Sequence, residues 1–113
     1  MGLPAPPAIG ANALPAGTYD GKVVIVTGGG TGLGKAIAIE FARIGASVAI
    51  LSRGEEHRAA GLAAVNAVGG KHIALPCDIR DAAAIAEAFD AVTEQLGLPD
   101  VLVNNAAGNF PVP

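Results

Sequence analysis

Residues 22–34 read KVVIVTGGGTGLG, and this stretch decides the fold class. Residues 22–27 are rich in β-branched side chains and almost continuously apolar, which is typical of a parallel strand buried on both faces of a sheet. A cluster of glycines follows, and Ile37, Phe41 and Ile44 then recur at intervals of four and three residues. This spacing predicts a helix that ends at the glycine directly after Ile44. The stretch is therefore expected to be a strand that turns through a glycine-rich loop into a helix.

The glycine-rich loop is suited to a bound pyrophosphate. Glycine lets the backbone approach a phosphate closely, and the start of the following helix offers free N–H groups with partial positive charge. A turn without a ligand would gain nothing from four glycines within five positions, because each one costs conformational entropy. The candidate cofactor-binding residues of this loop are Thr27, Gly28, Gly30, Thr31, Gly32, Leu33 and Gly34.

Strands and helices alternate regularly beyond this loop. The pattern predicts strands over residues 47–51, 72–75 and 101–104, a helix over residues 55–68, and a last helix that Asp81 can cap. Four strands alternating with three helices indicate right-handed crossovers and a parallel sheet with helices on both faces. The expected fold class is α/β, a partial Rossmann or doubly wound parallel sheet of strand order 3-2-1-4 that is truncated after its fourth strand.

The first 20 residues differ in composition from the rest. Prolines interleaved with alanine and glycine disfavour both helix and sheet there. We expect residues 1–20 to form a flexible Pro/Ala-rich arm, and residues 21–113 to be the N-terminal half of a dinucleotide-binding Rossmann domain.

The composition bounds the class of function. A chain of 113 residues with 51% hydrophobic and 15% charged side chains can fold as one domain. A formal net charge of −3 and a pI near 5.1 disfavour binding to nucleic acid or to a membrane. The single Cys77 can form neither an internal disulfide nor a cysteine zinc site. We therefore expect a buried thiol, no metal site and a reducing, cytoplasmic compartment.

The loop follows the pattern T-G-x-x-x-G-x-G, with Thr27, Gly28, Gly32 and Gly34 at the fixed positions. In this spacing the chain resembles the short-chain dehydrogenase/reductase family, and the resemblance extends over about residues 20–110. It implies an oxidoreductase that binds a nicotinamide dinucleotide.

A second interpretation of the same loop is the phosphate-binding loop of an NTPase. Residues 29–35 match G-x-x-x-x-G-K, but Ala36 stands where that motif needs a Ser or Thr hydroxyl for magnesium. A nucleotide-binding module without a redox function therefore remains the alternative.

The residues after the second predicted strand favour NADP(H) over NAD(H). An acidic residue there would hydrogen-bond the ribose of NAD, but the chain has Ser52 and Arg53. A carboxylate would repel a 2′-phosphate, whereas Ser52 can donate a hydrogen bond to it and Arg53 can pair with it. Arg58, one turn into the next helix, could do the same or lie in solvent.

The resemblance extends to two more segments. Asp78, followed by Ile79, lies where the family has an acidic residue that contacts the adenine amino group, although a cap on the following turn is the other interpretation. Asn104 begins a segment that resembles the family's N-N-A-G motif beneath the nicotinamide ribose. The cofactor-binding residues that these segments add are Asp78, Ile79, Asn105, Ala106, Ala107 and Gly108.

Within the family, residues 29–35, 52–53 and 105–110 are most similar to 2,4-dienoyl-CoA reductases. This similarity implies hydride transfer from NADPH to a small-molecule substrate, an acyl-CoA or a carbonyl compound, in a full-length parent that is a homo-oligomer.

The catalytic Ser, Tyr and Lys of the family have no counterparts here. The only tyrosine, Tyr19, precedes the first strand and is expected to pack, while His57 and His72 are expected to be a solvated helix residue and a strand-edge residue. We therefore expect no catalytic residue in this chain. Alone, it is expected to be inactive, to bind NADPH weakly or not at all, and to associate through the apolar edge at residues 101–103.

Overall fold

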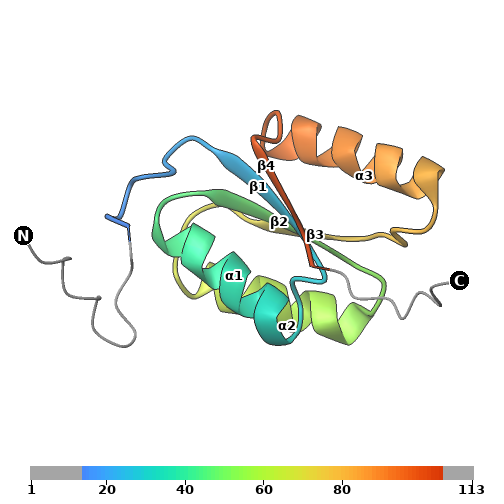
Figure 1. Cartoon of the computed structure of the whole chain (residues 1–113), viewed down its shortest axis with the longest axis horizontal. Helices are drawn as coiled ribbons and strands as arrows, with labels where there is room; N and C mark the ends of the chain where they lie inside the picture. The colour runs from blue at the N-terminus through green and yellow to red at the C-terminus, as the bar shows by residue number, and fades with distance from the viewer. Residues whose placement is uncertain (1–13, 106–113) are drawn as a thin grey trace, which may run out of the picture.

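The computed structural model describes residues 14–105, which form a four-stranded parallel sheet with helices on both faces (Figure 1). The strand order is β3-β2-β1-β4, which confirms the predicted α/β class and topology. The strands are β1 (Val23–Thr27), β2 (Ser47–Ser52), β3 (Ile73–Pro76) and β4 (Val101–Asn104). The helices are α1 (Gly32–Arg43), α2 (Glu55–Asn66) and α3 (Ala82–Gln95).

The sheet has a separate core on each face. Alternate residues of a strand point to opposite faces, so Val24 and Val26 of β1 pack with α1 and α2, whereas Ile25 packs with α3. All five residues of β1 are buried. Coverage by helices on both sides therefore explains the continuous apolar run of β1. Figure 1 shows α1 and α2 together on one side of the sheet and α3 on the other.

Small residues set the distance between α1 and the sheet. The buried residues of this helix are Gly34, Ala38 and Ala42, while Ile37 and Phe41 are only half-buried. Thin side chains let the helix lie close to the strands, and the larger apolar residues are left at its flank. The recurrence of large apolar residues thus located the helix, but alanine and glycine form its inner face.

Helix α3 begins as the sequence predicts. The Asp81 carboxylate accepts hydrogen bonds from the backbone N–H groups of Ala83 and Ala84 at 3.0 and 3.2 Å. These two bonds satisfy donors that a helix start otherwise leaves without an intrahelical partner.

His72 lies directly before β3, which begins one residue later than predicted, at Ile73. Its side chain is buried, with 8% of its surface exposed. Its Nδ1 accepts from the Val48 backbone N–H at 3.0 Å, so the ring proton is on Nε2, which donates to the Gly69 carbonyl oxygen at 2.6 Å. The imidazole therefore ties the start of β2 to the turn that precedes β3.

Two other predictions about single residues are confirmed. Tyr19 packs edge-on against Phe41 with ring centroids 5.3 Å apart, and its backbone N–H donates to the Ile44 carbonyl oxygen. Cys77 is buried, and desolvation raises the pKa of its thiol. Between residues 14 and 105, no helix is long and apolar enough to cross a membrane.

Candidate functional site

The candidate site lies at the edge of the sheet where the parallel strands end. The register pairs Thr27 of β1 with Leu51 of β2 on one side and with Asn104 of β4 on the other. It also pairs Ser52 with Pro76, the last residue of β3. The residues at or just after these strand ends, which the sequence analysis selected, are therefore brought to one edge.

Thr27 joins the ends of β1 and β4. Its hydroxyl donates to the Asn104 side-chain oxygen and accepts from the Asn105 backbone N–H, both at 3.0 Å. The Asn105 side chain in turn lies against Gly34, where an added Cβ would come within 2.5 Å of its Nδ2. Thr27 thus positions Asn105 beside the start of α1.

The glycine-rich loop needs glycine for two different reasons. Gly28 and Gly32 have φ angles of +66° and +50°, in the left-handed region that side chains disfavour. Gly34 is required by contact instead, because a Cβ there would overlap the Gly28 carbonyl oxygen. Among residues 14–105, a Cβ on Gly32 would meet no atom within 4 Å, so these residues leave open the space in front of the loop at Gly32.

The other glycines of the loop pack against α2 and β2. A Cβ on Gly30 would overlap the His57 carbonyl group, and one on Gly29 would lie 3.1 Å from Ile50. From the helix side, a Cβ on Gly61 would lie 2.8 Å from the Gly29 oxygen. Sequence reasoning did not select Gly61, although a glycine inside a helix signals such a close approach. The His57 side chain is exposed, as predicted.

The start of α1 suits an anionic group. Its N-cap residue, Thr31, makes no side-chain capping bond, and the first turn of α1 has no acidic residue. Its fourth residue is Lys35. The first N–H groups of a helix have no intrahelical acceptor and carry partial positive charge. With the open space at Gly32, this helix start fits the phosphate of a nucleotide.

The structure separates the functions of the two arginines near β2. Nη1 of Arg58 donates to the backbone carbonyl oxygens of Ser52 and Arg53 at 3.0 and 2.7 Å. Arg58 thereby fixes the backbone at the end of β2. The Arg53 side chain is 66% exposed and approaches Asp78 at 3.9 Å. Arg53 is therefore the cation better placed to meet a ligand at this edge.

Asp78 is held in the turn after β3, next to the half-buried Ile79. Its Oδ1 accepts from the Arg80 backbone N–H at 3.0 Å and from Arg80 Nε at 3.1 Å, and its Oδ2 accepts from Arg80 Nη2 at 3.0 Å. The hydrogen bonds from the Arg80 side chain, followed by that from its backbone, lower the pKa of the Asp78 carboxyl from 3.8 to about 2. The interpretation of Asp78 as a cap on the following turn is thus supported, while its contact with adenine stays a prediction.

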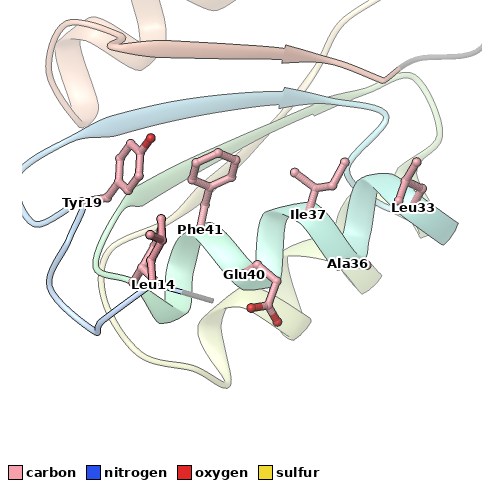
Figure 2. A pocket seen from close by; sticks show the side chains of 8 residues that line it. Leu14, Tyr19, Leu33, Ala36, Ile37, Glu40 and Phe41 are labelled. Atoms are coloured by element: carbon pink, nitrogen blue, oxygen red, sulfur yellow. The ribbon is translucent and has the colours of Figure 1, made fainter. Parts of the chain in front are cut away.

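The side chain of Leu33 lines a different surface, and three other predicted residues are not described by the structure. Leu33 is 68% exposed and forms part of the wall of an apolar cavity of about 450 Å³ on the flank of α1. Figure 2 shows Leu33, Ile37 and Phe41 along the helix, with Tyr19 near one end. Ala106, Ala107 and Gly108 lie outside the residues that the structure describes. Across residues 14–105, no cluster of His, Cys, Asp and Glu could hold a metal ion.

Comparisons with known proteins agree with this arrangement. A family model described as short chain dehydrogenase matches residues 22–113. An uncharacterized oxidoreductase of Caenorhabditis elegans is 50% identical in an alignment that covers 92% of this chain and 34% of that protein. A probable 2,4-dienoyl-CoA reductase of the same species is 47% identical over 83% of this chain and 31% of the relative. The chain thus spans about a third of the length of the curated relatives it matches.

Solved structures share the fold. A citronellol catabolism dehydrogenase of Pseudomonas aeruginosa superposes with a TM-score of 0.80 at 32% identity, over 88% of this chain and 42% of that one. An NAD⁺-bound xylitol dehydrogenase has a TM-score of 0.78 at 32% identity, over 80% of this chain and 35% of that one.

Proposed function

The chain belongs to the short-chain dehydrogenase family, and on that premise we propose that it is the NADP(H)-binding portion of an oxidoreductase. The observation that carries the choice of NADP(H) is the exposed cation at the end of β2. Arg53 and Ser52 occupy the position where a carboxylate would favour NAD(H), and Arg58 is engaged with their backbone. An exposed guanidinium there can pair with a 2′-phosphate.

The residues of the edge fit the parts of the dinucleotide. The backbone from Gly28 to Gly34, at the uncapped start of α1, would hold the pyrophosphate, and Ser52 and Arg53 would hold the 2′-phosphate. Asp78 and Ile79 would face the adenine. The segment that would lie under the nicotinamide ribose is Asn105, Ala106, Ala107 and Gly108, of which Asn105 is positioned by Thr27. When bound, NADPH supplies the hydride, while these residues bind and orient it.

For the whole enzyme we propose reduction of an enoyl or carbonyl substrate, as in a 2,4-dienoyl-CoA reductase. Two relatives named as probable 2,4-dienoyl-CoA reductases, 47% and 44% identical to this chain, support that choice. Other relatives are named hydroxysteroid dehydrogenases, at 41% and 39% identity, so the carbonyl class stays within the proposal. The buried single Cys77 supports a reducing, cytoplasmic compartment.

Comparative titration tests the proposal. The chain is titrated with NADPH, NADH and Mg-ATP, and binding is followed by amide shifts in NMR, which detects millimolar affinity. We expect NADPH to bind most tightly and Mg-ATP least, because Ala36 provides no hydroxyl for magnesium. Equal affinity for NADPH and NADH would contradict the assignment of Arg53. Preferential binding of Mg-ATP would contradict the redox function.

A further inference from the structure

Two arginines share the Asp78 carboxylate unequally. Arg80 contacts both carboxylate oxygens with two side-chain nitrogens, at 3.1 and 3.0 Å, and adds its backbone N–H at 3.0 Å. Arg53 reaches the same carboxylate with one nitrogen at 3.9 Å, beyond hydrogen-bond distance. Asp78 is therefore bound to Arg80 and only loosely attracted to Arg53.

The turn after β3 holds Arg80 where it can form the stronger of these two pairs. The Asp81 backbone N–H donates to the Asp78 carbonyl oxygen at 3.0 Å, and the Asp81 side chain caps α3. Arg80 lies between these two residues, so its backbone is held where its side chain can return to Asp78. Because Asp78 and Arg80 lie in one short turn, forming their bidentate pair costs little conformational entropy. An ordinary surface ion pair must instead fix two long side chains from separate segments.

We propose that Arg80 is a positioning residue for cofactor specificity: by occupying the Asp78 carboxylate, it leaves the Arg53 guanidinium available to a 2′-phosphate. This inference rests on the proposed function, because it concerns the same edge of the sheet. Arg80 acts through Asp78 and does not touch the nucleotide.

Without Arg80, the Asp78 carboxylate would be free to pair with Arg53. A carboxylate freed from its own turn lies 3.9 Å from the nearest nitrogen of Arg53 and needs a shift of about 1 Å to form a charge-assisted hydrogen bond. Arg53 would then be engaged with Asp78, and a 2′-phosphate would have to compete for it.

The experiment compares two nucleotides that differ in one group. Adenosine 2′,5′-bisphosphate and adenosine 5′-monophosphate are titrated into the chain, and the ratio of their affinities measures the preference for the 2′-phosphate. We expect Arg80→Ala to lower this ratio about fivefold, the size of one well-formed surface ion pair. Arg43→Ala, which removes an exposed arginine paired with Glu40 on α1, is the matched control and should leave the ratio unchanged.

A double-mutant cycle separates positioning from direct contact. In an Asp78→Asn background no carboxylate competes for Arg53, so adding Arg80→Ala should no longer change the ratio. An unchanged fivefold loss in that background would show that Arg80 touches the phosphate itself and would overturn the proposal. An independent readout is the Asp78 carboxyl signal in NMR, which should begin to titrate above pH 3 in Arg80→Ala but not in Arg53→Ala.

The failures of the two proposals are distinguishable. If the unchanged chain prefers the bisphosphate and Arg80→Ala keeps the same affinity ratio, the inference about Arg80 is wrong and the proposed function still holds. A chain without any preference for the 2′-phosphate overturns both.

Discussion

The Thr27 hydroxyl at the end of β1 accepts a hydrogen bond from the Asn105 backbone N–H at 3.0 Å, across 78 residues of sequence. The same hydroxyl donates to the Asn104 side chain, so one side chain fixes both the end of β4 and the residue that follows it. Asn105 then lies against Gly34 at the start of α1. The geometry of the candidate site therefore depends on Thr27 as much as on the glycines.

Replacing Thr27 with valine should destabilise the chain. Valine keeps the shape of the side chain but leaves the partly buried Asn105 N–H without its acceptor, so we expect a loss of about 1–2 kcal/mol in the free energy of unfolding. Urea unfolding measures it. Thr93→Val is the control, because the exposed Thr93 hydroxyl bonds only within α3. Equal effects at the two positions would show that the link between β1 and β4 contributes nothing.

Gly32 and Gly34 should respond differently to substitution by alanine. At Gly34 the new Cβ overlaps the Gly28 carbonyl oxygen, so both the stability of the fold and the affinity for the nucleotide should decrease. At Gly32 the Cβ points into open space, and the cost to folding should be about 1 kcal/mol, from the positive φ alone, while nucleotide binding is lost. Gly69→Ala, also at positive φ with open space around it, is the control for strain. Undiminished binding in a folded Gly32→Ala chain would place the phosphate elsewhere.

Arg53→Ala tests cofactor choice directly. In the full-length enzyme, we expect NADPH binding to weaken by about 1–3 kcal/mol, the range for losing a charge-assisted contact, and NADH binding to change little. Arg43→Ala, with the same change of charge on α1, should affect neither. Calorimetric titration with both cofactors gives the comparison, and a similar loss for NADPH and NADH would remove the assignment of Arg53.

The topology was predictable because it depends on patterns that each segment carries alone. The continuous apolar runs of β1 and β2 indicate strands covered on both faces, and Asp81 indicates the start of α3. Short crossovers between such elements leave few arrangements of the sheet. The order β3-β2-β1-β4 followed from these features together with the resemblance to a known family.

The contacts between segments were not predictable in the same way. His72 bonds to Val48 and Gly69, and its burial depends on how two loops meet. Gly61 is explained only by the glycine loop that packs on it. Arg80 could have been selected from its spacing to Asp78, but the competition with Arg53 appears only when β2 and β3 lie side by side.

The Asp78 pair should make stability depend on acid pH. Because the folded pKa of Asp78, about 2, lies below the ordinary value of 3.8, the ionised carboxylate stabilises the fold above about pH 4. That contribution is lost as the pH falls from about 4 to 2. The difference in urea midpoint between the unchanged chain and Asp78→Asn should therefore shrink between pH 5 and pH 2.5. Asp90→Asn, at an exposed position on α3, serves as the control. A difference that is constant over this range would contradict the pairing with Arg80.

The edge of β4 that faces away from β1 is open among the described residues. In residues 14–105, β4 pairs with β1 on one side only, and Leu102 is 53% exposed. Unpaired backbone groups beside apolar side chains recruit another strand, so we expect the 113-residue chain alone to associate at micromolar concentration.

Leu102→Lys should weaken this association, because a charged side chain on an edge strand opposes pairing with another chain. Leu98→Lys is the matched control, since Leu98 is 76% exposed but precedes the strand. Sedimentation equilibrium at 1–100 micromolar, a range chosen around the expected constant, compares the three chains. If the unchanged chain is a monomer that melts cooperatively, or if Leu98→Lys and Leu102→Lys weaken association equally, then β4 is not the surface that joins the copies. The predicted contact runs along the backbone of β4. Variants that change only side chains far from this edge should therefore still associate.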